Sequence, residues 1–461
     1  MKVLFCSSEV VPFAKTGGLA DVAGALPVAL EREGTQVKVA LPKYRSVKDR
    51  GATEKMGKNV EVYLVENEKY FDRKELYGEG GADYPDNLER FSFFCKQLLD
   101  LLQKNKFKPD IIHCNDWQTA LIPIYLQTTL SDNRFFQKTK TIFTIHNLAY
   151  QGLFGPEQFP LTGLNNELFN MQGLEFYGKV NLLKGGLLFS KFITTVSPTY
   201  AKEIQEPQFG CGLEGVLKER SNKLFGIING LDYSVWNPSQ DKHIFQKYDA
   251  SSLSSKYKNK TGLQEELGLP KNSAIPLIGI ITRLAEQKGI ELVIGALNKM
   301  AKSKLQFVLL GTGDEKYHVA LEKIKKKGYK NISIQIRFDN TLAHKIYAGS
   351  DMFLMPSYYE PCGLGQLISF KYGTIPIVRK TGGLADTVVD FDASKGSGNG
   401  FVFTDFTSEA LFNTITRSIA VYSGKKALWS KLAGKVMQQD FSWNASAKEY
   451  IKLYRRALDE K

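Results

Sequence analysis

The sequence is short of cysteine and has no long apolar run. Its 461 residues contain five scattered cysteines that form no Cys-x-x-Cys pair: Cys6, Cys95, Cys114, Cys211 and Cys362. An odd, scattered set excludes a disulfide framework and a cysteine zinc site, and it predicts a reducing, cytoplasmic location. The most apolar stretch, Leu182–Val196, is interrupted by two lysines and two glycines, so we expect no membrane span. The apolar residues Val3–Cys6 are too few for a signal peptide.

Several catalytic motifs are also absent. The chain has no Gly-x-Ser-x-Gly elbow and no Walker A sequence, which excludes the usual serine hydrolase and P-loop nucleotide sites. No cluster of His and Asp side chains has the spacing of a metal site. We therefore expect neither a metal ion nor another cofactor.

Charge of one sign is in excess, with a formal net charge of +13. Nucleic acid, an anionic membrane and a small anionic substrate are the three kinds of partner to consider. The lysine runs 256–260 and 323–330 are typical of solvated faces, and no RNA-binding aromatic signature accompanies them. We predict a basic surface that binds neither nucleic acid nor membrane, and whose field favours a nucleotide sugar.

The length predicts two domains, because a single core stops growing at about 250–300 residues. Short β-branched runs alternate with helical patterns, which is typical of parallel sheets built from βαβ units. We predict α/β domains over residues 1–240 and 263–443, joined by a polar linker over 241–262. The apolar spacing of Ala445–Leu458 predicts an amphipathic last helix within residues 444–461.

Six strands are predicted in each domain. Those of the first are Lys2–Ser7, Gln36–Leu41, Asp110–Cys114, Thr141–Ile145, Phe192–Val196 and Phe225–Ile228. Those of the second are Pro276–Ile281, Gln306–Leu310, Ser333–Ile336, Met352–Met355, Ile375–Val378 and Phe401–Phe403.

One heptapeptide occurs twice. Lys15–Asp21 and Lys380–Asp386 both read Lys-Thr-Gly-Gly-Leu-Ala-Asp, each after a predicted strand and before a predicted helix. Adjacent glycines at such a turn let the backbone approach a ligand, and the N–H groups with the positive helix end favour a phosphate. A dinucleotide site would need Gly-x-Gly-x-x-Gly and an acidic residue after the second strand, where the chain has Leu41-Pro42-Lys43. The repeat predicts two similar doubly wound halves with this turn at equivalent places.

In the second half, charged residues follow two predicted strands. Arg283 and Lys288 follow Pro276–Ile281, and the carboxylate of Glu360 follows Met352–Met355. Side chains at these strand ends point into the crevice where open α/β sheets bind ligands. The cations suit a diphosphate, although a surface pair capping the next helix is the alternative. The glycine-rich stretch after Glu360 is a candidate for binding sugar hydroxyls through its N–H groups, and Cys362 within it is more typical of a packed residue than of a nucleophile.

In the first half, polar residues end three predicted strands. Asp116 and Trp117 follow the third strand, and His146 and Asn147 follow the fourth. Asn229 ends the last strand. His146 at a strand end either hydrogen-bonds a sugar or is structural, and Asn229 either reaches the crevice or forms a simple Asn-Gly turn.

These motifs together resemble the bacterial glycogen synthases and plant starch synthases. They span nearly the whole chain in the family's order: the two Lys-Thr-Gly-Gly-Leu loops, Asp116-Trp117, Thr144–Asn147, Asn229–Asp232, Arg283 with Lys288, and Glu360–Leu364. The resemblance implies the GT-B fold, two Rossmann-like domains facing across a cleft, with the C-terminal helix returning to the first domain. It also implies transfer of glucose from ADP-glucose to the non-reducing 4-OH of an α-1,4-glucan with retention of configuration.

The resemblance further implies roles for individual residues. Lys15 matches the donor-binding lysine, Arg283 and Lys288 match the pair that holds the diphosphate, and Glu360 matches the essential glutamate that contacts the donor glucose. His146, counted with these four as catalytic, and Asn229 match residues near the reacting centre. Residues matched to substrate contacts are Gly17, Gly18, Asp21, Asp116, Asn147, Cys362, Gly363, Leu364, Thr381 and Gly382. Phe338 matches an aromatic ring that stacks on adenine, and Tyr84 and Trp117 are expected to be platforms for the glucan.

Two positions depart from the wider family pattern. Gly365 stands where many relatives have Thr, so one donor contact is lost, and Ile368 stands where other GT-B enzymes have a second carboxylate. We expect the cations to stabilise ADP as the glycosidic bond breaks, with the leaving phosphate as base and no metal.

Three other functions stay open from the sequence alone: a phosphorylase with a lysine-bound pyridoxal phosphate, a UDP-sugar transferase, and a non-catalytic glucan-binding protein. The sequence leaves the oligomeric state open.

Overall fold

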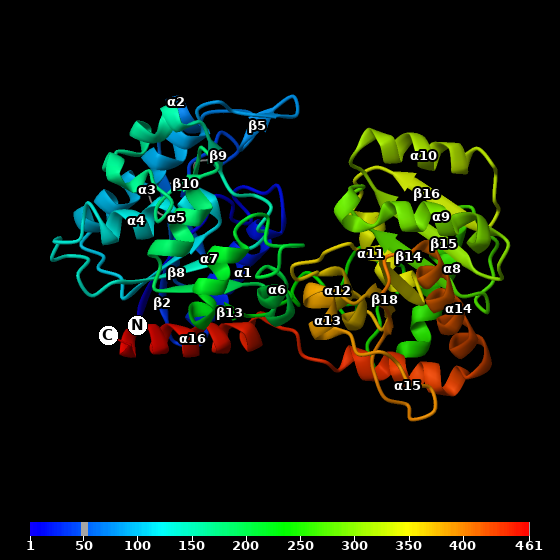
Figure 1. Cartoon of the computed structure of the whole chain (residues 1–461). Coiled ribbons are helices and arrows are strands. Elements are labelled where there is room, and N and C mark those ends of the chain that lie inside the picture. Colours follow the sequence, from blue (N-terminus) through cyan, green and yellow to red (C-terminus); the bar gives the residue numbers. More distant parts are fainter. Residues whose placement is uncertain (48–53, 461) are drawn as a thin grey trace. The chain divides into compact units, whose positions relative to one another are not determined.

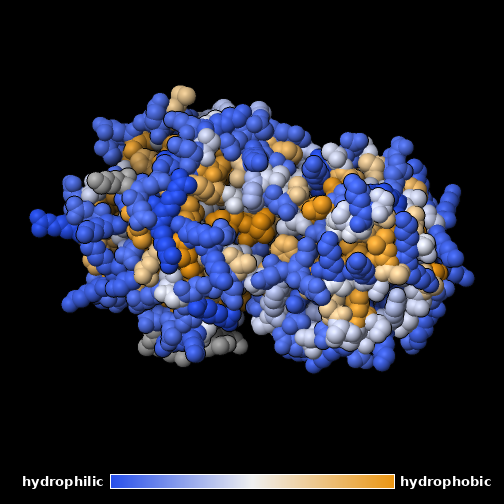
Figure 2. Space-filling view, turned by 90° about the horizontal axis from the view of Figure 1, so that it is seen from below, coloured by the Kyte–Doolittle hydropathy of each residue, from blue (hydrophilic) through white to orange (hydrophobic). Residues whose placement is uncertain are grey.

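The computed structural model describes residues 1–47 and 54–460 of the chain (Figure 1). It has two compact units. The first comprises Met1–Gly230 together with the C-terminal segment from Ser442, and the second comprises Leu231–Phe441. Among the described residues, no helix is both long enough and apolar enough to cross a membrane. The face drawn in Figure 2 is mostly hydrophilic, as the charged fraction of 24% predicts, and hydrophobic side chains form smaller patches within it.

The sheet of the first unit has the strand order β13-β12-β8-β7-β1-β2-β4-β3. All neighbours pair in parallel except β3 and β4. The strands are β1 (Lys2–Cys6), β2 (Gln36–Pro42), β3 (Glu54–Met56), β4 (Val60–Val65), β7 (Ile111–Asn115), β8 (Lys140–Ile145), β12 (Phe192–Thr195) and β13 (Leu224–Gly226). The six predicted strands are confirmed, but β3 and β4 were missed.

Helices and short strands complete the first unit. The helices are α1 (Gly18–Arg32), α2 (Glu68–Phe71), α3 (Asn87–Lys104), α4 (Leu121–Gln127), α5 (Leu182–Phe189), α6 (Pro198–Glu203), α7 (Glu214–Glu219) and α16 (Trp443–Asp459). The short strands are β5 (Gly78–Glu79), β6 (Ala82–Asp83), β9 (Leu153–Phe154), β10 (Glu175–Phe176) and β11 (Lys179–Asn181). The last helix packs on α1, and Tyr450 and Tyr454 bury their rings beside His113.

The second unit has a parallel sheet in the order β16-β15-β14-β17-β18-β19. Its strands are β14 (Leu277–Ile281), β15 (Gln306–Gly311), β16 (Ile332–Ile336), β17 (Met352–Met355), β18 (Ile375–Arg379) and β19 (Phe401–Phe403). Its helices are α8 (Lys256–Glu266), α9 (Ile290–Ala301), α10 (Glu315–Lys325), α11 (Asn340–Gly349), α12 (Gly365–Lys371), α13 (Gly382–Thr387), α14 (Ser408–Gly424) and α15 (Lys426–Met437). All six predicted strands are confirmed.

Alternating side chains bury both faces of this second sheet. Ile278 and Phe307 belong to one apolar core, whereas Leu277 and Val308 belong to another that includes α8 and α11. Helices on both faces of a parallel sheet define a doubly wound fold. Counted along the chain, the order is 3-2-1-4-5-6, the dinucleotide-binding Rossmann order.

The strand order reverses at one place in each sheet. In the second unit this switch point lies between β14 and β17, and in the first between β1 and β7. Open α/β sheets bind ligands outside the carboxyl ends of the strands at such points. The residues that follow these four strands are therefore the first place to look for a site.

The predicted linker over 241–262 lies within the second unit. Asp241 in it is buried and accepts hydrogen bonds from the Tyr372 hydroxyl at 2.5 Å and from His344 Nδ1 at 2.7 Å. The chain instead enters and leaves the second unit at Leu231 and Phe441, where the Leu231 N–H donates to the Phe441 carbonyl at 2.7 Å.

The lysine run 256–260 is not the solvated face that the sequence predicts. Lys260 is buried and pairs with Asp351 at 2.6 Å, and the buried ammonium of Lys256 donates to three carbonyl oxygens and to the Thr374 hydroxyl. Burial lowers the pKa of Lys256 to about 7. The lysines of the run 323–330 are exposed, as predicted.

Candidate functional site

In the second unit the switch point brings Lys288 and Glu360 together. Lys288 follows β14 and Glu360 follows β17, and the Lys288 ammonium lies 2.9 and 2.7 Å from the two carboxylate oxygens. The Ser357 hydroxyl donates to the same carboxylate at 2.9 Å. The side chain of Glu360 is 8% exposed and that of Lys288 is 22% exposed. Glu360 is thus a fixed acceptor, and Lys288 keeps one face toward solvent.

A glycine lets the Lys288 segment approach the end of β17. Gly289 has φ 63°, and a Cβ there would come 2.1 Å from the Pro356 carbonyl oxygen. No other residue fits this position without moving one of the two strand ends. Arg283 lies in the same segment and is exposed, and among the described residues its guanidinium forms no ion pair. It is therefore available to an anion.

The second heptapeptide, Lys380–Asp386, packs beneath the Glu360 loop. A Cβ at Gly382, whose φ is 43°, would come 1.9 Å from the Glu360 carbonyl oxygen, and one at Gly383 would come 2.0 Å from that of Cys362. The Gly383 N–H donates to the Glu360 carbonyl at 3.1 Å. Thr381 and Gly382 are both buried. These glycines support the backbone that carries Glu360.

The loop after Glu360 is held by hydrogen bonds from the buried side chain of Gln366. Gly363 has φ 73°, Leu364 directly precedes α12, and Cys362 is buried. The Gln366 amide donates to the carbonyls of Cys362 and Gly363 at 3.0 and 2.9 Å. Cys362 is therefore a packed residue. Phe338, at the far edge of this sheet, is 85% exposed and its ring is open for stacking.

In the first unit the Lys15–Asp21 loop follows β1. The Lys15 ammonium pairs with the Asp21 carboxylate at 2.7 and 2.9 Å, and the two side chains are 52% and 39% exposed. Cβ atoms at Gly17 and Gly18 would meet nothing within 4 Å. Packing thus does not require glycine here, and the space over this turn is open to a ligand.

Glu9 already binds the amides that the sequence assigned to a phosphate. Its buried carboxylate accepts from the Thr16 and Gly17 N–H groups at 2.5 and 3.0 Å, and from the Thr16 hydroxyl at 2.6 Å. The Tyr77 hydroxyl donates to it at 2.8 Å. The prediction of free N–H groups is therefore wrong for Thr16 and Gly17. Sequence reasoning missed Glu9, although an acidic residue just beyond the first strand was visible.

The repeat does not stand at equivalent places. Lys15–Asp21 follows the first strand of its sheet, whereas Lys380–Asp386 follows the fifth of its own. The two halves are alike in strand order, but this turn serves a different strand in each, so that part of the prediction is wrong.

Asp116 and His146 form a part-buried group at the carboxyl ends of β7 and β8. The Asp116 carboxylate accepts a hydrogen bond from the backbone N–H of His146 at 2.8 Å. The imidazole Nε2 of His146 lies 2.9 Å from Asn115 Oδ1. The Asn115 amide nitrogen donates to the Cys6 carbonyl, which orients the amide and assigns the imidazole proton to Nε2. Burial lowers the pKa of His146 to about 3 and raises that of Asp116 to about 7. The imidazole is therefore neutral.

The remaining first-unit candidates differ in exposure. Asn147 is half-buried and accepts from the Ala149 N–H at 3.1 Å in a turn. Asn229 is buried, and its Oδ1 has no hydrogen-bond partner among the described residues. Tyr84 is half-buried, with the guanidinium groups of Arg73 and Arg90 over its ring at 4.6 and 5.0 Å.

Trp117 is a core residue. It is 9% exposed and packs edge-on against Phe91 and Phe154, and a Cβ at Gly152 would come 2.7 Å from its indole. An indole with so little exposed surface cannot be a stacking platform, so the expected glucan platform is wrong at this position. Tyr150, beyond His146 in the loop after β8, is 53% exposed and presents an aromatic ring at this end of the sheet.

Among the described residues, no group of three or more His, Cys, Asp or Glu side chains is arranged to hold a metal ion. All five cysteines lie in the described part of the chain, and none forms a disulfide.

Family models match both halves of the chain. Residues 2–219 match the starch synthase catalytic domain, and residues 264–427 match the glycosyl transferases group 1. The chain is 50% identical to a glycogen synthase of Geotalea uraniireducens, with all of both chains covered. It is 45% identical to a glycogen synthase of Thermotoga maritima, with 99% of each covered.

Solved structures are also similar. The catalytic domain of starch synthase IV from Arabidopsis thaliana, bound to ADP and acarbose, has a TM-score of 0.90 and 36% identity, with 99% of each chain covered. A sucrose-phosphate synthase from Thermosynechococcus elongatus has a TM-score of 0.63 at 17% identity, covers the whole chain and bears on the fold alone.

Proposed function

The chain belongs to the glycogen synthase and starch synthase family of GT-B glycosyltransferases, and from this membership we propose how its residues perform the family's reaction. The enzyme transfers glucose from ADP-glucose to the non-reducing 4-OH of an α-1,4-glucan and retains the configuration. We propose that side chains following the strands of both sheets bind the donor and the acceptor, and that no metal takes part.

The Lys288–Glu360 pair at the switch point of the second unit carries the proposal. Arg283 and Lys288 of the second unit bind the diphosphate of the donor, and Lys15 is the donor-binding cation of the first unit. As the glycosidic bond breaks, negative charge grows on the leaving ADP. Cations fixed before the reaction stabilise that charge without reorganisation. Removing one such group costs roughly 10²–10³ in kcat.

Glu360 and His146 orient the sugar. The Glu360 carboxylate is held by Lys288 and Ser357, so its remaining lone pairs accept from glucose hydroxyls. The neutral imidazole of His146 presents Nδ1 as an acceptor, because Nε2 donates to Asn115. The unpartnered Oδ1 of Asn229 accepts another hydroxyl. Phe338 stacks on the adenine, and Tyr84 and Tyr150 contact the glucan.

Retention follows from attack on the face that ADP leaves. The glucose passes through an oxocarbenium-like state, and the departing phosphate takes the proton of the acceptor 4-OH. The pair of carboxylates that retaining glycosidases use, about 5 Å apart, is not part of this proposal, because Ile368 stands where a second acid would follow Glu360.

We propose that the reaction needs no metal ion, because the positive charge comes from Lys15, Arg283 and Lys288. Transfer of label from ADP-glucose should therefore proceed at the same rate after dialysis against a chelator. A rate that falls on chelation and returns with Mg²⁺ would contradict this assignment. A cytoplasmic location is likewise proposed, supported by five cysteines of which none forms a disulfide.

Substitution of the two second-unit cations tests the proposal. In Arg283→Ala and in Lys288→Ala, incorporation of radiolabelled glucose from ADP-glucose into glycogen should fall about 100-fold or more in kcat. Lys304→Ala, an exposed lysine of the same unit, is the matched control and should retain activity. Near-normal kcat in both variants would refute the assigned role. Competition between ADP-glucose and UDP-glucose tests the donor, and ADP-glucose should be preferred.

A further inference from the structure

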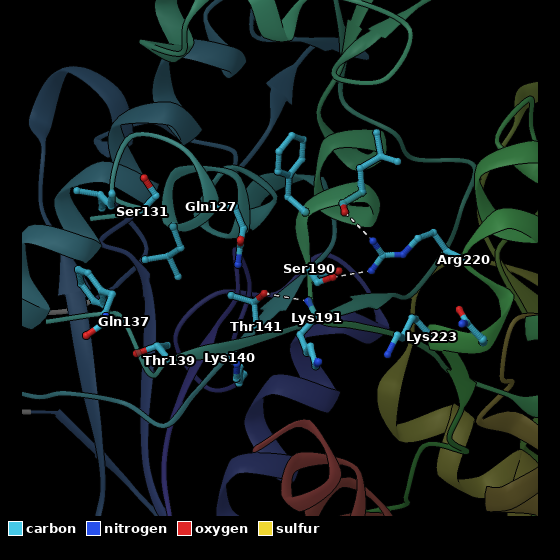
Figure 3. Close-up of a pocket in the computed structure, with 16 residues that line it drawn as sticks. Gln127, Ser131, Gln137, Thr139, Lys140, Thr141, Ser190, Lys191, Arg220 and Lys223 are labelled. Carbon is cyan, nitrogen blue, oxygen red and sulfur yellow. Dashed lines mark hydrogen bonds between the residues drawn. The ribbon is translucent and has the colours of Figure 1, made fainter. Parts of the chain in front are cut away.

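A cavity of about 800 Å³ opens in the first unit, away from the candidate site residues of that unit (Figure 3). Lys140 begins β8, Lys191 directly precedes β12 and Lys223 directly precedes β13, and all three line the cavity. The cavity thus lies at the amino ends of these strands. His146 and Asn147 lie beyond the carboxyl end of β8, at the opposite end of that strand.

The cavity is rich in positive charge. Lys191 and Lys223 share one carboxylate, that of Glu460, which lies 2.8 Å from the Lys223 ammonium and 3.8 Å from that of Lys191. Arg456 of α16 lies 2.8 Å from the same carboxylate. Three lysines, Lys140, Lys191 and Lys223, therefore face the single carboxylate of Glu460, which leaves an excess of positive charge. Burial lowers the pKa of Lys191, and the neighbouring charges of Lys223 and Lys140 lower it further.

One wall of the cavity is fixed in place. The Arg220 guanidinium donates to the carbonyls of Leu188 and Ser190 at 2.7 and 2.6 Å, at the carboxyl end of α5. Ser190 is 3% exposed and lines the cavity, and its hydroxyl has no hydrogen-bond partner among the described residues. A buried hydroxyl without a partner costs stability unless a ligand or water satisfies it.

The other wall carries neutral polar groups. Figure 3 shows Lys140, Lys191 and Lys223 along the lower edge of the drawn residues, and Ser131 and Gln137 on the left. The cations suit a phosphate group, and the amides and hydroxyls suit the hydroxyls of an attached sugar. The volume is many times that of one phosphate.

We infer that this cavity binds a phosphate-bearing anion, a sugar phosphate in preference to free phosphate, and that Glu460 is its internal competitor. The phosphate replaces the Glu460 carboxylate on Lys191 and Lys223, and Ser190 donates to the bound group. Glu460 follows α16 and belongs to no strand, so its side chain can turn away from the lysines without disturbing the sheet. The inference is independent of the roles proposed for Arg283, Lys288 and Glu360.

Calorimetric titration of the full-length protein at constant ionic strength tests this. Inorganic phosphate and ribose 5-phosphate are the two probes. The expected result is saturable binding of both, with ribose 5-phosphate tighter. Equal affinities would overturn the assignment of the neutral wall to a sugar.

Three variants locate the binding. The double variant Lys191→Ala/Lys223→Ala should weaken both probes about tenfold or more, because two charge-assisted contacts are lost. Lys304→Ala/Lys431→Ala removes the same charge from exposed sites of the second unit and should change nothing. Glu460→Gln should tighten both probes several-fold, and it keeps the test decisive if the double variant folds poorly.

A donor-site variant separates this cavity from the proposed active site. Arg283→Ala/Lys288→Ala should bind both probes as the wild type does. Binding lost in that variant but retained in Lys191→Ala/Lys223→Ala would overturn the inference, because the anion would then occupy the donor site. Absence of binding by both the wild type and Glu460→Gln would also overturn it.

Discussion

At the scale of single residues, two buried glutamates are held in different ways. Glu360 is neutralised by the ammonium of Lys288, whereas the contacts of Glu9 are two backbone N–H groups and two hydroxyls. A carboxylate held by neutral donors keeps its negative charge in place and orders the loop that supplies them. Glu9 is thus a positioning residue for the loop that carries Lys15.

Glu9→Gln should loosen this loop while leaving the rest of the first unit folded. The glutamine side chain lacks the negative charge of the carboxylate, and its NH₂ group would face one of the backbone N–H donors from which the carboxylate now accepts. The KM for ADP-glucose should rise about tenfold, the equivalent of about 1.4 kcal/mol, with a smaller change in kcat. Steady-state kinetics at saturating glycogen measures both constants.

Glu68→Gln, an exposed glutamate in α2 of the same unit, is the control and should leave KM unchanged. An unaltered KM in Glu9→Gln would show that the loop does not depend on this carboxylate.

The neutral His146 makes stability depend on pH. Its pKa is about 3 in the folded protein and about 6.5 in the unfolded chain, so the unfolded chain binds the proton first as the pH falls. The stabilisation is complete above pH 6.5 and is lost toward pH 3. Between pH 7 and pH 5 this residue should remove about 2 kcal/mol from the free energy of unfolding.

Urea denaturation of the wild type and of His146→Gln at pH 7 and pH 5 measures that contribution. The variant should lose less stability over this interval than the wild type. Asp116 acts in the opposite direction. Burial raises its pKa, so its contribution to the free energy of unfolding falls as the pH rises toward 7. Asp116 is present in both proteins, so this contribution does not affect the comparison. Equal losses would contradict a neutral imidazole.

At the scale of elements, the two heptapeptides have one sequence and two physical roles. The glycines of the second are required by packing on Glu360 and Cys362, and those of the first have open space above them. Gly382→Ala should therefore destabilise the second unit by about 3 kcal/mol or more, since it combines positive φ with a clash. Gly17→Ala should stay within about 0.5 kcal/mol of the wild type but lose donor affinity.

Thermal unfolding and titration with ADP measure these two effects in the matched pair. The expectation is contradicted if Gly382→Ala is as stable as the wild type, or if Gly17→Ala binds ADP normally.

Much of the architecture was predictable because the buried strands are continuous apolar runs. Every strand of the second sheet was found in this way, and so were six in the first. The missed β4 begins by alternation, with Val60 and Val62 buried and Glu61 and Tyr63 half-buried, so it lacks the continuous buried run of the other strands. β3 is a three-residue edge strand and gives little signal of either kind.

The sequence predicted which residues belong to the candidate site, but it did not predict how buried they are or what they contact. The sequence placed Lys288 and Glu360 after the first and the fourth predicted strand of the second half. The structure pairs these two strands side by side, which brings the two side chains together. The sequence contained no sign that Lys256 and Lys260 are buried, because most of their acceptors, such as the Ala348 carbonyl and the Asp351 carboxylate, lie about 90 residues away in the sequence. Nor did it show that Phe91, Phe154 and Gly152 cover Trp117.

At the scale of the whole molecule, the second unit has its own core and the first depends on the last helix. Leu231–Phe441 expressed alone should unfold cooperatively and bind ADP. Residues 1–230 alone should not fold, because α16 supplies the buried side chains of Trp443, Tyr450 and Tyr454, each worth about 2 kcal/mol of burial. Circular dichroism and calorimetry of the two segments check this, and a folded 1–230 would contradict it.

The hydrogen bond between Leu231 and Phe441 brings the first and last residues of the second unit next to each other in space. The second unit is therefore an insertion whose two ends meet. A segment spliced in between these two residues would reconnect without lengthening either junction. Exchanging Leu231–Phe441 for the same segment of a relative should therefore transfer the relative's donor preference, while the glucan-contacting residues of the first unit stay those of the recipient.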